Sequence, residues 1–280
     1  MCDQCGCGLP GELPVTISNH HHEHDHGHDH SHEHGHSHEH GPHDHHQEHE
    51  VTSAERRTVE VRHAILEKNN RLAERNRGFF HARGLLVLNV LSSPGSGKTT
   101  LIRQTIRLLQ DRLKVGVIVG DLATDNDARV LRESGAPVVQ INTGAVCHLE
   151  SEMVGRAVQQ LDLAGLQLLI IENVGNLVCP ASYDLGEDLR VVLLSVTEGE
   201  DKPLKYPPVF QSANAALVTK LDLATACDFN HAAARANLRK LAPAAAVFEL
   251  AAKTGEGMEA WCDWLLGRQQ TVATRDPLRA

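Results

Sequence analysis

A short glycine-rich segment is the part of the chain whose residue types most clearly specify chemistry. Residues 92–100 read Ser-Ser-Pro-Gly-Ser-Gly-Lys-Thr-Thr and directly follow an apolar run at residues 85–91. Gly95 and Gly97 allow backbone N–H groups to close around phosphate oxygens, and Lys98 brings a positive charge to the β- and γ-phosphates. A loop of this kind between a strand and a helix predicts binding of a nucleoside triphosphate.

The polar residues around Lys98 complete the predicted loop. The Thr99 hydroxyl is placed to bind Mg2+, and Ser96 and Thr100 are expected to contact the nucleotide. The usual pattern G-x-x-x-x-G-K-[ST] has glycine where this chain has Ser92. The order of strand, loop and helix outweighs this departure and disfavours the alternative, a glycine-rich turn that binds nothing.

Three other polar segments follow apolar runs and are expected at the same edge of a sheet. They are Gly120-Asp121, Glu172-Asn173-Val174-Gly175 and Thr219-Lys220-Leu221-Asp222. The Asp222 carboxylate can accept hydrogen bonds from guanine N1 and the exocyclic amine, and Lys220 can lie over the base. This segment predicts GTP rather than ATP, although Asp222 could instead serve the N-terminus of a helix at residues 224–228.

The chain begins with three closely spaced cysteines. Its first residues read Met-Cys-Asp-Gln-Cys-Gly-Cys-Gly and place Cys2, Cys5 and Cys7 in one short loop. Three thiolates and the terminal amine would form a soft four-coordinate site that suits Ni(II). Zinc also binds three thiolates, so the residue types leave the choice of metal open.

A histidine-rich tract follows these three N-terminal cysteines. Sixteen of the 20 histidines lie between His20 and His49, and the first 50 residues hold ten Asp or Glu and no Lys or Arg. Many imidazoles favour nickel, copper or zinc with little geometric selection, so we expect the tract to store or buffer metal. An artificial affinity tag is the disfavoured alternative, because acidic residues, Gly and Ser interrupt the histidines.

The composition of the remaining chain excludes several classes of protein. The formal net charge of −9 belongs to the tail, since the residues after it carry nearly balanced charges. No basic stripe and few aromatic residues are present, so we expect no nucleic-acid partner. The chain has no long apolar run and no signal pattern, so we expect it to have no membrane partner and to stay in the cytoplasm. In that reducing compartment cysteines act as ligands or core residues rather than in disulfides.

Four cysteines lie beyond the tail. Cys147 and His148 follow an apolar run, and Cys179 follows the segment that ends at Gly175. An adjacent Cys and His cannot easily close a tetrahedron in one chain, so a metal site shared across a two-fold axis would suit them. A loop Cys-His pair alone is more often structural. The other two cysteines, Cys227 and Cys262, have apolar neighbours in helical segments and are expected in the core.

The pattern of apolar runs predicts the elements that position these residues. Expected strands cover residues 85–91, 115–119, 137–141, 166–171, 189–196, 215–218 and 246–250. Expected helices lie at residues 101–113, 125–133, 149–161, 229–241 and 258–266. Strands without polar alternation, separated by helices, indicate an α/β fold with a parallel sheet covered on both faces. Ligands in such folds lie at the carboxyl ends of the strands.

The predicted organisation has four parts. Residues 1–51 form a Cys/His-rich metal-binding tail that is expected to be disordered, because it has too little apolar side chain to offset the entropy of ordering. Residues 52–84 form a leading helix, residues 85–270 form the nucleotide-binding domain, and residues 271–280 form a C-terminal tail.

Taken together, these motifs resemble those of the nickel-insertion GTPases of the HypB family. The likeness rests on the phosphate-binding loop, Asp121, the Glu-Asn-Val-Gly and Thr-Lys-Leu-Asp segments and the Cys-x-x-Cys-x-Cys start. It implies a three-layer P-loop GTPase in which Thr99, Asp121 and Glu172 surround Mg2+. It also implies a homodimer that depends on GTP and metal.

The resemblance implies roles for other residues as well. Gly175 would respond to the γ-phosphate, Lys253 would lie near the base, and Lys202 would reach nucleotide across the dimer. Metal binding becomes the favoured reading for Cys147, His148 and Cys179, with Ni2+ or Zn2+. We expect slow hydrolysis, since the sequence offers no obvious catalytic glutamine or arginine finger.

The implied function is delivery and insertion of Ni(II) during maturation of a nickel-iron hydrogenase. The implied partners are a HypA-like nickel metallochaperone and the large-subunit precursor of the hydrogenase. A urease-type accessory GTPase is the nearest alternative, but its metal motif reads Cys-Pro-His in one run. A nickel storage protein with an uncoupled GTPase domain is another, and a cobalamin-related metallochaperone GTPase is a third.

Overall fold

The computed structural model describes residues 53–121, 126–144 and 146–274. Its strands are β1 (Leu86–Leu91), β2 (Val115–Asp121), β3 (Val138–Asn142), β4 (Leu168–Glu172), β5 (Leu189–Ser195), β6 (Ala215–Thr219) and β7 (Ala246–Glu249). Its α-helices are α1 (Ser53–His81), α2 (Lys98–Leu109), α3 (Asn126–Arg132), α4 (Ser151–Val158), α5 (Lys202–Lys205), α6 (Pro207–Gln211), α7 (His231–Leu241) and α8 (Met258–Ala273). Short 3-10 turns are η1 (Cys179–Ser182), η2 (Val196–Glu198), η3 (Leu221–Leu223) and η4 (Thr225–Cys227).

All seven strands pair in parallel in one sheet of order β3-β2-β4-β1-β5-β6-β7. Strand β1 therefore lies at the centre, between β4 and β5. Each expected strand is confirmed to within two residues. For the inner strands the agreement follows from burial on both faces, which makes each of them a mostly apolar run, whereas the edge strands β3 and β7 are only partly buried.

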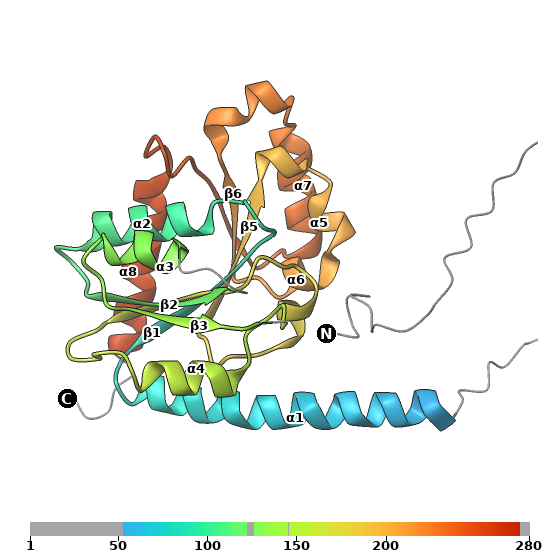
Figure 1. Cartoon of the computed structure of the whole chain (residues 1–280). Helices are drawn as coiled ribbons and strands as arrows, with labels where there is room; N and C mark the ends of the chain where they lie inside the picture. Colours follow the sequence, from blue (N-terminus) through green and yellow to red (C-terminus); the bar gives the residue numbers. More distant parts are fainter. Residues whose placement is uncertain (1–52, 122–125, 145, 275–280) are drawn as a thin grey trace, which may run out of the picture.

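Helices cover both faces of the sheet and give three layers (Figure 1). On one face, alternate strand residues such as Leu88 and Val117 pack with side chains of α2, α3 and α8. On the other face, residues such as Val87 pack with α1 and α4, and residues such as Val192 pack with α6 and α7. The predicted three-layer α/β fold is confirmed.

Two long helices lie near the ends of the described chain. The leading helix is α1, and α8 continues to Ala273, past the expected domain end at residue 270. None of the helices in the described residues is long and apolar enough to cross a membrane. The tail, with Cys2, Cys5, Cys7 and the histidine tract, lies outside the described residues.

Helix α1 lies alongside α4, and its N-terminal half extends past the other described elements (Figure 1). The C-terminal half packs tightly on the loop before β5. A Cβ atom added at Gly186 would lie 2.6 Å from the backbone oxygen of Ala73 on α1, and Gly186 has a φ of +88°. Only glycine accepts both conditions without strain.

Gly186→Ala is therefore expected to lower the free energy of unfolding by more than about 2 kcal/mol, since a left-handed backbone and a close contact both oppose the methyl group. Gly84→Ala is the matched control, because Gly84 has a φ of +61° but open space around it. It should lose only roughly 1–2 kcal/mol. Denaturant unfolding of both variants measures the difference, and equal losses would contradict tight packing of α1 at Gly186.

Candidate nucleotide and metal site

The phosphate-binding loop joins β1 to α2, at the carboxyl edge of the central strand. Gly95 and Gly97 have φ values of 73° and 95°, which explains the glycines, because other residues rarely adopt this region. Ser96 is buried, and Thr100 is half-buried in the first turn of α2. The loop thus has the backbone shape and the position that the sequence predicts.

Lys98 is buried and its Nζ donates to the Ser92 hydroxyl at 3.0 Å. Burial lowers the pKa of Lys98, and the negative charge of Glu172 acts in the opposite direction. Ser92, which replaces the usual glycine, therefore gives the ammonium group a polar partner inside the protein. Its own hydroxyl donates to the backbone oxygen of Ser93 at 2.7 Å.

Glu172, the last residue of β4, lies beside Thr99. The Thr99 hydroxyl donates to Glu172 Oε1 at 2.8 Å, while Glu172 Oε2 is buried without a hydrogen-bond partner among the described residues. Burial raises the pKa of Glu172 to about 7, although Lys98 and the Thr99 hydroxyl lower it. A buried carboxylate oxygen without a partner, next to a hydroxyl, fits a divalent cation such as Mg2+.

Two aspartates add negative charge near this pair. Asp121 ends β2, and Asp127 lies in the first turn of α3. Both charges raise the pKa of Glu172 and of Lys98. The structure thus brings Asp121 into the neighbourhood expected from sequence and adds Asp127, which sequence reasoning missed.

The Thr-Lys-Leu-Asp segment contacts the phosphate-binding loop directly. The Thr219 hydroxyl donates to the Ser96 backbone oxygen at 2.9 Å, and Lys220 Nζ donates to the Gly95 backbone oxygen at 2.6 Å. Asp222 is exposed in η3 and caps neither η3 nor η4. Among the described residues its carboxylate has no hydrogen-bond or ion-pair partner, so it is available to a ligand.

Lys253 is exposed in the turn after β7, and this turn lies next to the Thr-Lys-Leu-Asp segment. The Leu221 backbone N–H donates to the Leu250 backbone oxygen at 3.3 Å, which joins the two segments. The residues expected near a guanine base therefore come from two neighbouring strand ends.

Glu198 is a second residue that sequence reasoning missed. Its Oε2 accepts hydrogen bonds from the Ser96 hydroxyl at 3.0 Å and from the Ser195 backbone N–H at 3.1 Å. Lys202 Nζ lies 3.1 Å from Glu198 Oε1. The Glu198 carboxylate therefore links Lys202 to Ser96 in the phosphate-binding loop of the same chain. A Ser-x-x-Glu capping box after β5 was the available sequence signal.

Three potential metal ligands come together, with ligand atoms within 4.8 Å of one another: Cys147, His148 and Cys179. We call them the cysteine cluster. The two Sγ atoms are 3.2 Å apart. Within the described residues this is the group of soft donors that could hold a metal ion. Two thiols and an imidazole at this spacing fit Ni(II) or Zn(II), and a further ligand would complete a four-coordinate site.

His148 is buried, and its ring stacks on Tyr183 with the centroids 3.9 Å apart. Neither ring nitrogen has a hydrogen-bond partner among the described residues, and the nearest Glu150 oxygen is 3.6 Å from Nε2. Burial lowers the pKa of His148 to about 4. The ring is thus neutral at physiological pH, which is the form that binds metals.

The segment after β4 connects the two groups of residues. A Cβ atom at Gly175 would lie 2.9 Å from Pro94 Cα in the phosphate-binding loop. The next residue, Asn176, donates to the Cys147 backbone oxygen at 3.2 Å. Two consecutive residues of this segment therefore contact the two groups: Gly175 contacts the phosphate-binding loop and Asn176 contacts the cysteine cluster.

The remaining cysteines differ from each other. Cys262 is buried in α8, as expected, and burial raises the pKa of its thiol to about 11. Cys227 is exposed, so the prediction that it lies in the core is wrong. It ends the short turn η4, where its alanine neighbours do not cover it, rather than lying in a regular helix.

Glu172→Gln is expected to stabilise the protein at about pH 8 in the absence of nucleotide and divalent cations. Folding raises this carboxyl pKa from 4.5 to about 7, so its contribution to stability is complete below 4.5 and is lost as the pH rises through 7. Glutamine keeps an acceptor for Thr99 and has no charge to bury. It should recover on the order of 3 kcal/mol. Thermal unfolding at about pH 5 and pH 8 checks this, and an equal gain at both would contradict it.

Comparisons with known proteins agree with this geometry. The profile of the CobW/HypB/UreG nucleotide-binding domain family matches residues 86–249. Hydrogenase maturation factor HypB of Escherichia coli (strain K12) is 50% identical over 212 residues, 76% of this chain and 73% of that protein. HypB from Helicobacter pylori in complex with nickel is 41% identical with a TM-score of 0.70, covering 73% of this chain and 96% of that one. HypB from Archaeoglobus fulgidus is 38% identical with a TM-score of 0.68, covering 72% and 99%. The matched domain runs from the start of β1 to the end of β7, and the chain belongs to the HypB family of hydrogenase maturation factors.

Proposed function

We propose that this protein is a GTP-hydrolysing nickel metallochaperone that delivers and inserts Ni(II) during maturation of a nickel-iron hydrogenase. Family membership supports this proposal, since the relatives are hydrogenase maturation factors and one was solved with nickel. The observation that carries it is the short connection from Pro94 through Gly175 and Asn176 to Cys147. Through this connection the state of the nucleotide can reach the metal ligands.

Different residues of the nucleotide site would bind the phosphates and the Mg2+ ion. Backbone N–H groups of Gly95, Ser96 and Gly97 would hold the phosphates, and Lys98 would neutralise their charge. Thr99, Asp121 and Glu172 would hold Mg2+, which supplies charge stabilisation when bound. The sequence offers no obvious catalytic glutamine or arginine finger, so we infer slow turnover.

Specificity for guanine would come from Asp222. Its exposed carboxylate would accept hydrogen bonds from guanine N1 and the exocyclic amine, with Lys220 and Lys253 near the base. Lys220 already lies over the phosphate-binding loop, where it contacts the Gly95 oxygen. The base and phosphate sites would therefore share this lysine.

Metal would bind to Cys147, His148 and Cys179, and a homodimer would bring two such sets together. Three donors per chain leave a coordination position for a second subunit or a partner. In this proposal Cys2, Cys5 and Cys7 form a separate soft site, and the histidine tract stores nickel. Both Ni2+ and Zn2+ suit the thiolates, and GTP would favour one metal geometry and GDP another.

The partners follow from the proposed reaction. A HypA-like metallochaperone would exchange nickel with the dimer, and a hydrogenase large-subunit precursor would receive it. A urease-type role is less well supported, because Cys147-His148 and Cys179-Pro180-Ala181 differ from a single Cys-Pro-His run.

Cys147→Ala tests the coupling between nucleotide and metal. We expect GTP to increase the dimer mass of the wild type, and graded Ni(II) or Zn(II) to change its GTP turnover. The variant should keep GTP-dependent dimerisation but lose the metal effect, because one thiolate of the cluster is gone. Cys227→Ala is the matched control, since this exposed cysteine lies outside the cluster.

The measurements are GTP hydrolysis rates and dimer mass by light scattering, with GTP or GDP. Wild-type turnover that is indifferent to metal, with all nickel held by residues 1–50, would instead favour a storage protein with an uncoupled GTPase domain.

Asp222→Asn tests the guanine assignment. Loss of charge-assisted hydrogen bonds should weaken GTP binding by about 10- to 100-fold. Xanthine carries a carbonyl where guanine carries an amine, so the asparagine amide should improve binding of xanthosine triphosphate. Asp228→Asn, at an exposed aspartate just after η4, is the control. Competition titrations with a fluorescent nucleotide give both affinities, and unchanged GTP binding would remove Asp222 from the site.

A further inference from the structure

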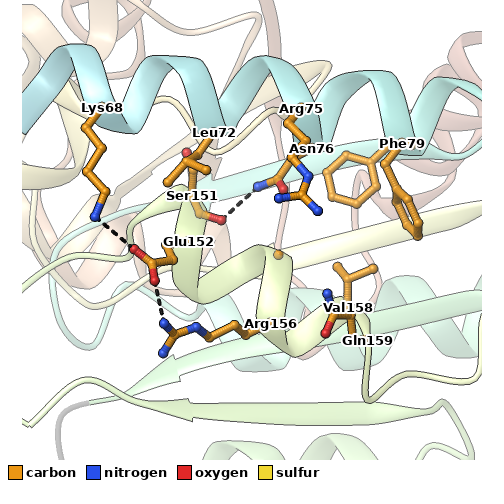
Figure 2. A pocket seen from close by; sticks show the side chains of 12 residues that line it. Lys68, Leu72, Arg75, Asn76, Phe79, Ser151, Glu152, Arg156, Val158 and Gln159 are labelled. Atoms are coloured by element: carbon orange, nitrogen blue, oxygen red, sulfur yellow. Dashed lines mark hydrogen bonds and ion pairs between the residues drawn. The ribbon is translucent and has the colours of Figure 1, made fainter.

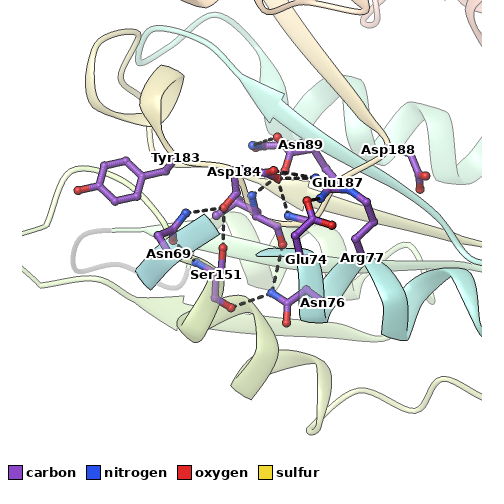
Figure 3. Close-up of polar contacts among 12 residues, drawn as sticks. Asn69, Glu74, Asn76, Arg77, Asn89, Ser151, Tyr183, Asp184, Glu187 and Asp188 are labelled. Atoms are coloured by element: carbon purple, nitrogen blue, oxygen red, sulfur yellow. Dashed lines mark hydrogen bonds and ion pairs between the residues drawn. The ribbon is translucent and has the colours of Figure 1, made fainter. Parts of the chain in front are cut away.

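Two buried asparagines of α1 face the loops that carry the cysteine cluster. Asn69 and Asn76 are seven residues apart, which places them on one face of the helix two turns apart. They are only 5% and 9% exposed. Figure 3 shows both amides pointing toward Ser151 and the segment at Asp184.

Each asparagine bridges the same two loops. Asn69 Oδ1 accepts from the Ser151 backbone N–H at 2.9 Å, and Asn69 Nδ2 donates to the Asp184 backbone oxygen at 2.7 Å. Asn76 Nδ2 donates to the backbone oxygens of Ser151 at 2.8 Å and Leu185 at 3.1 Å. The Ser151 hydroxyl also donates to the Asp184 backbone oxygen at 2.5 Å.

An ion pair reinforces the two asparagines. Arg77 Nη2 donates to both carboxylate oxygens of Asp184, at 2.8 and 2.7 Å. Asp184 Oδ1 in turn accepts from the Gly186 backbone N–H at 2.8 Å. We call Asn69, Asn76 and Arg77 the α1 clamp, because together they hold the start of α4 against the segment before β5.

The clamp lies a few residues from the metal ligands. Ser151 is three residues after His148, and Asp184 is five residues after Cys179. Tyr183, the neighbour of Asp184, carries the ring that stacks on His148. The clamp therefore restrains the segment that carries Tyr183, on which the His148 ring stacks. It also restrains the start of α4, which follows His148 in the chain.

The loop between Cys179 and β5 is also held by a residue of the sheet. Arg190 of β5 donates to the backbone oxygens of Ala181 at 2.9 Å and Tyr183 at 3.0 Å, and pairs with the buried Glu187. The Cys179 loop is thus restrained from α1 and from the sheet. Between these restraints, small displacements of His148 relative to Cys179 are opposed by several buried hydrogen bonds.

We propose that the α1 clamp positions His148 and Cys179 for metal, so that metal affinity depends on α1 residues that do not touch the ion. This inference rests on the proposed metal binding by the cluster. The asparagines satisfy backbone groups of Ser151, Asp184 and Leu185, and buried backbone groups left without partners are unfavourable. Positioning residues of this kind commonly change metal affinity by 10- to 100-fold.

The same helix interface offers a matched control. Next to Asn76, α1 and α4 line a cavity of about 450 Å3 (Figure 2). At its rim Lys68 Nζ lies 3.2 Å from Glu152 Oε2, an exposed contact between the same two helices. Lys68→Ala removes an α1 to α4 contact without touching the clamp.

The test uses the full chain with Cys2, Cys5 and Cys7 replaced by Ser, so that thiolate signals come from the domain. Co(II) is the probe, because thiolate-to-cobalt charge-transfer bands do not arise from the histidine tract. Asn69→Ala and Asn76→Ala should each weaken Co(II) binding at this site by about tenfold or more and change the ligand-field bands. GDP affinity should stay within about twofold, and Lys68→Ala should match the parent.

Three results would overturn the clamp. Parent-like Co(II) affinity and spectra in both variants would show that the ligands do not need it. Equal losses of GDP affinity and of the unfolding midpoint would show a general structural role. If the parent lacks charge-transfer bands that depend on Cys147, the proposed metal site fails and the clamp with it. Should the buried variants fail to fold, Arg77→Gln, at a partly exposed position, should weaken Co(II) binding in the same direction.

Discussion

The close contact between Gly175 and Pro94 determines how near the segment after β4 lies to the phosphate-binding loop. A Cβ atom at residue 175 would lie 2.9 Å from Pro94 Cα and 3.0 Å from its nitrogen, so the two backbones are as close as glycine permits. On either side of this contact, Glu172 accepts from Thr99 and Asn176 donates to Cys147. One short segment after β4 therefore contacts both the phosphate-binding loop and the cysteine cluster.

The fold could be predicted because burial leaves a direct mark on sequence. The inner strands of the sheet are buried on both faces and mostly apolar, so a run such as residues 85–91 stands out between helical stretches. The phosphate-binding loop was also predictable, because its backbone conformation requires glycine at fixed positions. The placement of Asp121, Glu172 and Asp222 at strand ends followed from the rule that parallel strands point their carboxyl ends to one edge.

The contacts between loops were not predictable in the same way. Glu198 and Asp127 influence the nucleotide residues through space, and their local sequences resemble ordinary helix starts. Asn69 and Asn76 lie in a polar helix where spaced asparagines are unremarkable until their partners, 75 to 115 residues away, are known. Cys227 shows the converse error, because local apolar composition suggested burial but a short turn left the side chain at the surface.

The short distance between Cys147 and Cys179 has a chemical consequence beyond metal binding. Their Sγ atoms are 3.2 Å apart, and a disulfide bond needs only about 1.2 Å less. An oxidant would therefore compete with the proposed metal ion for the same two thiols. Oxidation to a disulfide would remove both proposed sulfur ligands in one step. Metal stoichiometry for this protein is thus meaningful only beside a count of its reduced thiols.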